Sequence, residues 1–209
     1  MSVKNLILFL ILWPAVGAFL NYVTGRYSRI VRDYFADFIC LIEFLAALSC
    51  YKFLGAFEAQ TATLTLTLPE LCGSFGMKFS LDGFRFIYAV IISFMWLVTT
   101  IFSREYFRGH RNRNRYYLYV TLTLSTIMGV FLSGDLYTTF LFFEMMSLFS
   151  YIMVVQEETP EAQRAAQTYL AIAIIGGLAT LTGLILFYSR AGTLDIAELS
   201  KLKIGRAHV

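Results

Sequence analysis

Long apolar segments, separated by short polar or charged links, make up most of this chain. Six of them reach the roughly 17 to 25 residues that a helix needs to cross a bilayer. They are Asn5–Tyr22, Tyr34–Leu54, Phe84–Phe102, Tyr116–Leu132, Leu136–Val155 and Thr168–Tyr188. This pattern predicts an all-α membrane protein with about six transmembrane helices.

The link between the second and third apolar segments has a different pattern. In TLTLTLPELCGSFGMKFSLDG, polar and apolar residues alternate on both sides of a break at Pro69, Gly73 and Gly76. Alternation with a period of two is typical of a β-strand, and a break rich in proline and glycine is typical of a turn. The sequence therefore predicts a β-hairpin over about residues 61–82.

The composition agrees with a membrane protein rather than with a soluble domain. Of the 209 residues, 58% are hydrophobic and 15% are charged, whereas charged residues make up about 25% of a typical soluble domain. The mean hydropathy is +0.66. Only Lys4 precedes the first apolar segment and no small-residue cleavage site follows it, so we interpret this segment as a retained helix.

The basic residues are concentrated in two links, after the first and after the third apolar segment. They are Arg26, Arg29 and Arg32, and then Arg104, Arg108, Arg111, Arg113 and Arg115. Short basic links stay in the cytoplasm, so we expect the N-terminus to lie outside. The link QEETPEAQR falls on the same side although it is acidic, because acidic residues have little effect on orientation. Orientation and anionic headgroups account for the arginines, so we expect no nucleic-acid partner.

The sequence indicates no cofactor and no metal site. Cys40, Cys50 and Cys72 lack the spacing of a metal site, and the only histidines are His110 and His208. No glycine-rich phosphate loop is present. The candidate chemistry therefore lies in polar residues within the apolar segments.

Glu144 lies near the middle of the fifth apolar segment, DLYTTFLFFEMMSLFSYIMVV. If the segment is helical, Glu144 is roughly 13 Å beyond Asp135 and close to the centre of the membrane. An unpaired charge there costs from about 2.5 to more than 10 kcal/mol. The cost is relieved if the carboxyl is protonated, or if it faces water and a cationic partner. Either state makes Glu144 a candidate proton carrier; the alternative is a neutral, hydrogen-bonded glutamate that holds helices together.

Other polar residues are candidates to support a proton path. Helical spacing puts Tyr137, Ser147 and Tyr151 on the same side as Glu144, and Thr168 opens the sixth apolar segment. Hydroxyls of this kind orient water or a carboxylate, or else bond back to their own helix.

Two more carboxylates and a group of small residues complete the candidates. Glu43, about two turns inside the cytoplasmic boundary, is either functional or extends to the membrane surface. Asp135, at the outer end of its helix, is either part of a proton path or a helix cap. Gly176, Gly177, Thr180 and Gly183 are expected to allow close helix packing.

The last residues, IGRAHV at positions 204–209, match what a common sequencing adapter encodes. We therefore expect them to be an artefact, and the chain to be the front part of a longer membrane protein.

The stretch GVFLSGDLYTTFLFFEMMSLFSYIMV resembles a signature of the antiporter-like membrane subunits of NADH–quinone oxidoreductase, or complex I. The same family includes subunits of Mrp-type cation/proton antiporters and of membrane-bound hydrogenases. The stretches LDGFRFIYAVII, FSREYF and GTLDIAEL are similar in kind, so the resemblance covers about Asn5 to Leu202. Its most specific part is the Gly-Asp-Leu link followed at fixed spacing by Phe-Phe-Glu.

The resemblance implies a fold of about fourteen helices with inverted repeats, of which this chain is the front part. Residues 1–115 would form the first three helices and the outer hairpin, and 116–203 would begin the proton-translocating domain with helices four to six. Glu144 corresponds to a family glutamate whose usual partner is a lysine on a broken seventh helix. Where many members carry a further lysine, this chain has Thr168, for which Arg164 could substitute.

The resemblance also implies that Glu144 alternates between protonated and charged forms as that lysine approaches and withdraws. The leading hypothesis is a non-redox, proton-pumping subunit of an NADH–quinone oxidoreductase-like or hydrogenase-like complex in a prokaryotic cell membrane. Electron transfer to quinone in other subunits would drive it.

The alternative is an Mrp-type antiporter subunit without redox chemistry, with Na+ as another candidate ion. A third hypothesis is a structural bundle in which Glu144 is inert. The first two imply partner subunits in the membrane.

Overall fold

The computed structural model describes residues 3–53, 62–66, 76–109 and 112–199. Within these ranges the chain is mostly helical. The elements are α1 (Val3–Tyr27), α2 (Arg29–Ser49), the short 3-10 helix η1 (Cys50–Phe53), β1 (Ala62–Leu66), β3 (Met77–Leu81), α4 (Gly83–Tyr106), α5 (Arg113–Leu132), α6 (Leu136–Val154), α7 (Pro160–Ala191) and α8 (Ile196–Leu199). The expectations for Cys72, for His110 and His208, and for residues 204–209 concern positions outside the described ranges.

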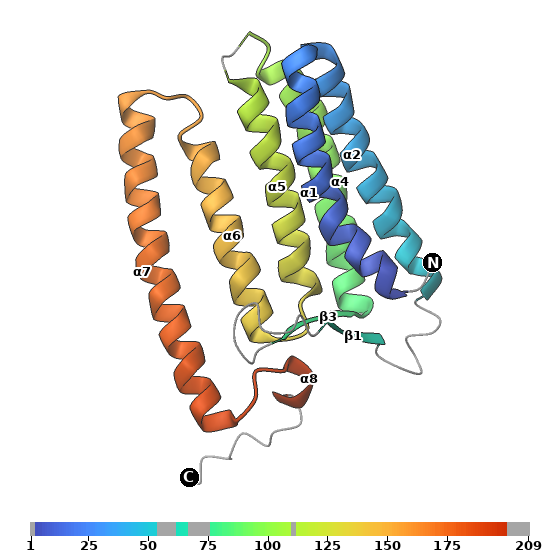
Figure 1. Ribbon diagram of the computed structural model, residues 1–209, viewed down its shortest axis with the longest axis vertical. Helices are drawn as coiled ribbons and strands as arrows, with labels where there is room; N and C mark the ends of the chain where they lie inside the picture. The colour runs from blue at the N-terminus through green and yellow to red at the C-terminus, as the bar shows by residue number, and fades with distance from the viewer. Residues whose placement is uncertain (1–2, 54–61, 67–75, 110–111, 200–209) are drawn as a thin grey trace.

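Helices α1, α2, α4 and α5 pack into a bundle (Figure 1). Within it, α1 contacts α2 and α5, and α4 contacts the same two helices. The buried core lies inside this bundle and includes Leu10, Cys40, Ala89 and Met128, one from each helix. Helix α6 packs on α5, and α7 packs on α6, so α7 is the outermost helix.

The links between helices gather at two ends of the molecule. One end of the molecule, which we call the basic end, holds the last residues of α1, α4 and α6 and the first residues of α2, α5 and α7 (Figure 1). Both arginine-containing links therefore lie at the same end, as their charge pattern predicts. The acidic link lies there too, where Glu158 pairs with Arg115 at 2.8 Å.

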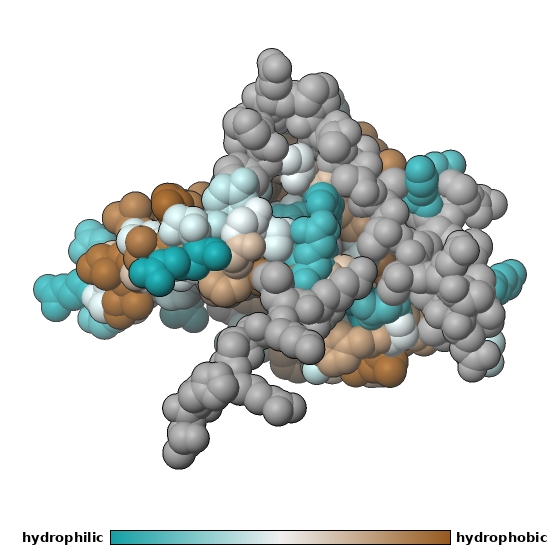
Figure 2. Space-filling view, turned by 90° about the horizontal axis from the view of Figure 1, so that it is seen from below, coloured by the Kyte–Doolittle hydropathy of each residue, from teal (hydrophilic) through white to brown (hydrophobic). Residues whose placement is uncertain are grey.

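The opposite end, which we call the hairpin end, carries β1, β3, the α5–α6 link and α8 (Figure 1). Figure 2 views this end and shows hydrophilic residues among the hydrophobic ones. Strands β1 and β3 pair antiparallel, in a register that places Ala62 opposite Leu81. Residues 67–75, which connect the two strands, lie outside the described ranges, so the predicted turn stays a prediction.

Five of the described helices are long and apolar enough to cross a membrane. They cover Lys4–Tyr27, Arg29–Lys52, Gly83–Tyr106, Leu136–Val154 and Pro160–Ala191. The remaining long helix, α5, corresponds to the fourth predicted segment, Tyr116–Leu132, and is rich in hydroxyl side chains. Thr121 of α5 donates to the carbonyl of Tyr117 in its own helix at 2.8 Å, and Ser125 donates to the carbonyl of Ile11 in α1 at 2.6 Å. These hydroxyls are therefore satisfied although the helix is buried in the bundle.

Helix α2 begins earlier than predicted, at Arg29 rather than at Tyr34. The hydroxyl of Ser28 accepts a hydrogen bond from the backbone N–H of Val31 at 3.4 Å and caps the helix. The predicted start was wrong because it followed the apolar residues, whereas the charged first turns belong to the same helix.

Helix α7 also begins before its apolar stretch, at Pro160 rather than at Thr168. The hydroxyl of Thr159 accepts from the backbone N–H of Ala162 at 3.1 Å. A capping threonine followed by proline at the first helical position is a common start for a helix. The polar first turns of α7 therefore extend the helix into the link that joins it to α6.

Candidate functional site

Glu144 lies near the middle of α6 and is partly buried. Helix α6 begins at the cap formed by Asp135 and ends at Val154. Glu144 is therefore far from both ends of the helix, where water would be most available. Among the described residues, no ion-pair or hydrogen-bond partner holds its carboxylate.

The carboxylate of Glu144 faces α7 at Gly177. If Gly177 carried a Cβ atom, that atom would lie 2.7 Å from Oε2 and 2.8 Å from Oε1 of Glu144. Real side chains essentially never approach so closely. Gly177 therefore leaves the space in which the carboxylate sits, and the site lies between α6 and α7.

A tyrosine on α7 reaches the same part of α6. The hydroxyl of Tyr169 donates to the backbone carbonyl of Ser147 at 3.4 Å. Ser147 lies one turn beyond Glu144, so a hydroxyl from α7 and the carboxylate from α6 meet in one interface. Tyr137 and Tyr151, the other members of the predicted stripe, lie on α6 and are partly buried.

Thr168 is not brought to this interface. It lies on an exposed part of α7, and its hydroxyl donates to the carbonyl of Arg164 in its own helix at 3.1 Å. Because Thr168 and Tyr169 are neighbours in sequence, they point in different directions from the helix. The hydroxyl that meets α6 is therefore that of Tyr169.

Of the small residues of α7 that were expected to allow close helix packing, Gly177 is the one that meets another helix within the described part of the chain. A Cβ on Gly176 or Gly183 would meet nothing within 4 Å. Thr180 is exposed and bonds to the carbonyl of Gly176 at 2.8 Å. Within the described part of the chain, close approach therefore occurs at Gly177, because this is the glycine on the side that faces α6.

Glu43 is a second carboxyl group inside the helices. Its side chain is fully buried in the bundle, and among the described residues neither carboxylate oxygen has a hydrogen-bond partner. Because α2 begins at Arg29, Glu43 lies nearly four turns, or roughly 21 Å, from that end. The depth of Glu43 below the membrane surface, expected to be about two turns, stays a prediction, because the charged first turns of α2 also belong to the helix. The full burial of Glu43 does not fit a side chain that extends to the membrane surface.

Polar groups lie between Glu43 and the basic end, on the same side of α2. Asp37 is two turns before Glu43 and accepts from Arg104 of α4 at 3.0 Å. Cys40, between them, is fully buried and is a free thiol. Asp33 lies one turn before Asp37. Helical spacing therefore places two carboxylates, one thiol and Glu43 in a single row that runs inward from the basic end.

Asp135 caps α6 and also joins it to β3. Its carboxylate accepts from the backbone N–H of Thr138 at 2.8 Å and from the Thr138 hydroxyl at 2.6 Å. The same carboxylate accepts from the backbone N–H of Lys78 at 3.1 Å. This geometry is that of a helix cap, which is one of the two roles expected for Asp135.

The hairpin end is closed by an ion pair that joins residues far apart in sequence. The ammonium group of Lys78, on β3, donates to the carboxylate of Asp195, just before α8, at 3.0 Å. The hydrogen bond that Lys78 donates to Asp195 raises the pKa of Lys78 above its usual range, and burial opposes this only in part. Burial alone would raise the pKa of Asp195, but hydrogen bonds from Lys78 and from the backbone N–H of Ala197 hold it below its usual range.

Sequence reasoning missed a network of charges at the basic end. Arg32 and Arg113 both pair with Asp33, at 2.8 and 2.7 Å. Arg113 also donates to the carbonyl of Arg104 at 3.1 Å. The network joins α2, α4 and α5. The signal that could have found it is the charge complementarity between Asp33 and Asp37 at the start of α2 and the second basic link.

Known proteins resemble this chain in the region that contains Glu144. The family described as NADH:quinone oxidoreductase/Mrp antiporter, transmembrane region, matches residues 133–208. This match includes α6, α7 and their interface. A Na+/H+ antiporter subunit of Alkalihalophilus pseudofirmus is 27% identical over 205 residues, which are 97% of this chain and 40% of that protein.

Solved structures resemble the whole arrangement of helices. A chain of the membrane-bound sulfane sulfur reductase, an archaeal respiratory membrane complex, has a TM-score of 0.77 at 22% identity. The match covers 94% of this chain and 40% of that one. A chain of the Mrp complex from Dietzia sp. also has a TM-score of 0.77, at 19% identity, over 95% of this chain and 37% of that one.

This chain thus spans about 40% of the length of the proteins that it matches. The matched family, the similarity to the antiporter protein and the shared arrangement of helices agree with one another. The chain is thus similar to the antiporter-like membrane subunits that NADH:quinone oxidoreductases and Mrp antiporters share, and residues 133–208 match the model of that family.

Proposed function

We propose that this chain is part of a membrane subunit that translocates protons, and that Glu144 carries the proton. The observation that supports this proposal best is the place of the carboxylate, in the middle of α6 and against the gap left by Gly177. A carboxyl group at such depth is expensive to keep charged, so it readily exchanges a proton when its surroundings change.

In this proposal, Glu144 takes up a proton from one side and releases it when a cation approaches. The described residues supply no such cation, so the partner is a lysine on a later helix of the complete subunit, as in the family. Tyr169 and Ser147 keep α6 and α7 together next to the carboxylate. Tyr137 and Tyr151 line the same side of α6 and hold water along the path.

Glu43 is the second protonatable group of the proposed path. A fully buried carboxyl without a partner is stable as the neutral acid, because charging it would require desolvation of the full charge. The row of Asp33, Asp37 and Cys40 leads from Glu43 to the basic end and offers groups that pass a proton. The capping role of Asp135 keeps the start of α6 in place at the other end.

The subunit is proposed to act in an Mrp-type antiporter, which exchanges protons for a cation such as Na+. The similarity to a Na+/H+ antiporter protein over 97% of this chain supports this assignment. A redox-driven complex is the second candidate, supported by the similar helix arrangement in an archaeal respiratory complex. In both cases other membrane subunits are the partners, all six long helices cross the membrane, and the N-terminus lies outside.

Proton transport by vesicles that contain the assembled complex tests the proposal. Glu144→Gln keeps the size of the side chain but cannot exchange a proton, so we expect transport to fall at least about tenfold. Vesicles energised by a Na+ gradient and vesicles energised by an electron donor separate the two assignments. Transport in response to the Na+ gradient alone supports the antiporter.

Glu161→Gln is a matched control, because Glu161 is an exposed glutamate in the first turn of α7. The Glu161→Gln variant loses the same charge, but at the surface, so the complex that contains it should transport protons at the wild-type rate. Wild-type transport in the Glu144 variant, at equal amounts of assembled complex, would reject the role of Glu144.

A further inference from the structure

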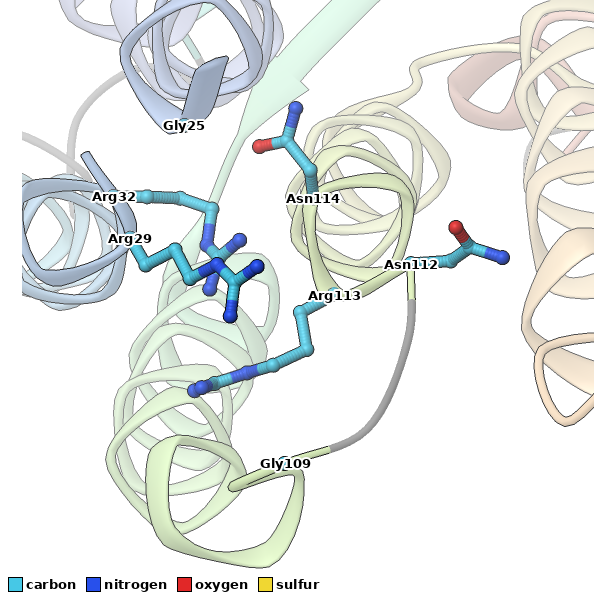
Figure 3. A pocket seen from close by; sticks show the side chains of 7 residues that line it. All are labelled: Gly25, Arg29, Arg32, Gly109, Asn112, Arg113 and Asn114. Atoms are coloured by element: carbon cyan, nitrogen blue, oxygen red, sulfur yellow. The ribbon is translucent and has the colours of Figure 1, made fainter. Parts of the chain in front are cut away.

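A cavity of about 360 Å³ opens at the basic end, between the end of α1, the start of α2 and the start of α5. We call it the arginine pocket. Its lining consists of Gly25, Arg29, Arg32, Gly109, Asn112, Arg113 and Asn114. In Figure 3, Arg29 and Arg32 extend from α2 toward α5, and Arg113 extends from α5 toward α2. Three guanidinium groups from two helices therefore converge on one cavity.

Among the described residues, the lining contains three cations and no carboxylate. Asp33 lies behind it and accepts from Nε and Nη2 of Arg32 through one oxygen, and from Nη2 of Arg113 through the other. One carboxylate is thus shared between two guanidinium groups, and with Arg29 the cluster keeps a positive charge. The nearby Glu158 is held by Arg115 and by the side-chain amide of Asn112, which points away from the three arginines (Figure 3).

Several N–H donors in the pocket are unused. Nε of Arg113 is buried and has no hydrogen-bond partner among the described residues. Arg29 is exposed, and within the described ranges its guanidinium group has neither an ion pair nor a hydrogen bond. The buried Arg32 engages only part of its guanidinium with Asp33. The pocket therefore offers donors from the buried Arg32, from the largely buried Arg113 and from the exposed Arg29, and an unpaired buried donor such as Nε of Arg113 is costly.

These features suit a phosphate group. Guanidinium groups bind phosphate oxygens through paired N–H donors. Two helices begin at the pocket, α2 at Arg29 and α5 at Arg113, and the positive ends of their dipoles favour an anion. The apolar helices end here, so the pocket lies at the depth of lipid headgroups if they span the membrane.

The neighbouring cavity at the basic end has a different character. It is lined by Arg29, Ile30, Asp33, Tyr34, Arg104, Glu105, Arg108 and Arg113. The carboxylates of Asp33 and Glu105 face it, so its arginines already have anionic neighbours. The arginine pocket is therefore the one of the two that favours an added anion.

We propose that the arginine pocket binds a phosphate group, carried either by an anionic lipid or by a soluble phosphate. Arg29 is the residue whose whole guanidinium is free to bind it, and Arg32 and Arg113 supply the buried donors. The site is separate from Glu144, so this proposal and the proton-transport proposal can fail independently.

The test uses the complete subunit in its purified complex and compares Arg29→Ala with the wild type. Native mass spectrometry counts the lipids retained after exchange into phosphatidylcholine with or without phosphatidylglycerol. Calorimetry with inorganic phosphate tests a soluble ligand. We expect Arg29→Ala to weaken phosphate-group binding at least about fivefold, because one arginine near a membrane surface contributes roughly that factor. Arg29→Glu should abolish binding.

Arg26→Ala is the matched control, since Arg26 is an exposed arginine nearby that bonds to Tyr22 and does not line the pocket. Retention of phosphatidylglycerol but not of inorganic phosphate assigns the site to a lipid, and the reverse result assigns it to a soluble phosphate. The proposal is overturned if neither ligand binds to the wild type, or if Arg26→Ala weakens binding as much as Arg29→Ala.

Discussion

Gly177 of α7 leaves the space that the carboxylate of Glu144 occupies, with less than 3 Å between the carboxylate oxygens and the position of a Cβ atom on residue 177. This relationship makes the glycine as specific a probe of the site as the glutamate itself. A side chain at position 177 acts on the carboxylate without changing any titratable group.

We expect Gly177→Ala to displace the Glu144 carboxylate and to slow proton transport, with little loss of stability. The atoms that it meets are the end of a flexible side chain, which can rotate away, so the free energy of unfolding should change by less than about 1 kcal/mol. Transport by vesicles and thermal unfolding in detergent measure the two effects separately.

Gly176→Ala is the control for this change. It is the adjacent glycine of the same helix, and a Cβ there meets nothing within 4 Å. It makes the same change in helix propensity without touching Glu144. Equal transport rates in the two variants would show that contact with the carboxylate does not matter.

Glu43→Gln should leave the bundle intact, because an amide replaces a carboxyl of nearly the same size that is already expected to be neutral. Glu43→Lys should prevent stable assembly, since it puts an unpaired ammonium group into a fully buried position. The amount of folded protein in membranes measures both. Equal amounts of the two variants would mean that the surroundings of Glu43 are open to water.

Transport measurements on Glu43→Gln then test its place in the proton path. A rate well below that of the wild type, in protein of equal stability, supports the path from the basic end. A wild-type rate leaves Glu43 as a structural acid and removes it from the mechanism.

Asp33→Asn should destabilise the bundle by about 3 to 5 kcal/mol, because it leaves the buried Arg32 and the largely buried Arg113 without their shared carboxylate. Glu105→Gln removes a carboxylate from an ion pair whose two side chains are 77% and 76% exposed. Exposed pairs contribute at most about 1 kcal/mol, so this variant should unfold almost like the wild type. Unfolding curves of the two proteins in the same detergent decide the matter, and similar curves would contradict the buried network.

The pair of Lys78 and Asp195 predicts a pH dependence for the hairpin end. The pKa of Asp195 is lowered from 3.8, so its contribution is present above that value and is lost as the pH falls through the folded-state pKa. The pKa of Lys78 is raised from 10.5, so its contribution is present below that value and is lost as the pH rises further. The pair should therefore stabilise this end between about pH 4 and pH 10.

Hydrogen exchange at the backbone N–H of Leu136, which donates to the carbonyl of Leu194 at 3.0 Å, reports on this junction. We expect faster exchange at both extremes of pH than its intrinsic pH dependence explains. Asp195→Asn should exchange faster at neutral pH, by a modest factor because Lys78 is 39% exposed. No difference between the variant and the wild type at neutral pH would contradict the contribution of the pair.

The sequence was sufficient to predict features that depend on neighbours along the chain. The apolar segments located the long helices, and the position of Asp135 before an apolar run indicated the cap that starts α6. Glu144 could be named as a candidate, because a single carboxylate in the middle of an apolar segment stands out whatever the tertiary structure. These signals come from residues that are close together in the sequence, and such residues also determine the secondary structure.

Features that depend on distant partners were not predictable in the same way. Asp33 and Arg113 are separated by 80 residues and Lys78 and Asp195 by 117, and single charges carry no periodic pattern. The start of α2 was misplaced because it was set at the first apolar residue rather than next to the capping Ser28. Which glycine of α7 faces α6 depends on how that helix is rotated, and composition alone does not determine the rotation.

The ion pairs at the basic end bear on the closing of the bundle. In the folded bundle Asp33 and Asp37 neutralise part of the charge of Arg32, Arg104 and Arg113. Before the helices meet, Arg104 and Arg113 cannot reach these carboxylates, whereas Arg32 and Asp33 are neighbours on α2. Closing the bundle therefore leaves the net charge of the basic end unchanged and exchanges the hydration of Arg104 and Arg113 for ion pairs between helices. Separating the helices again would require both arginines to give up these pairs.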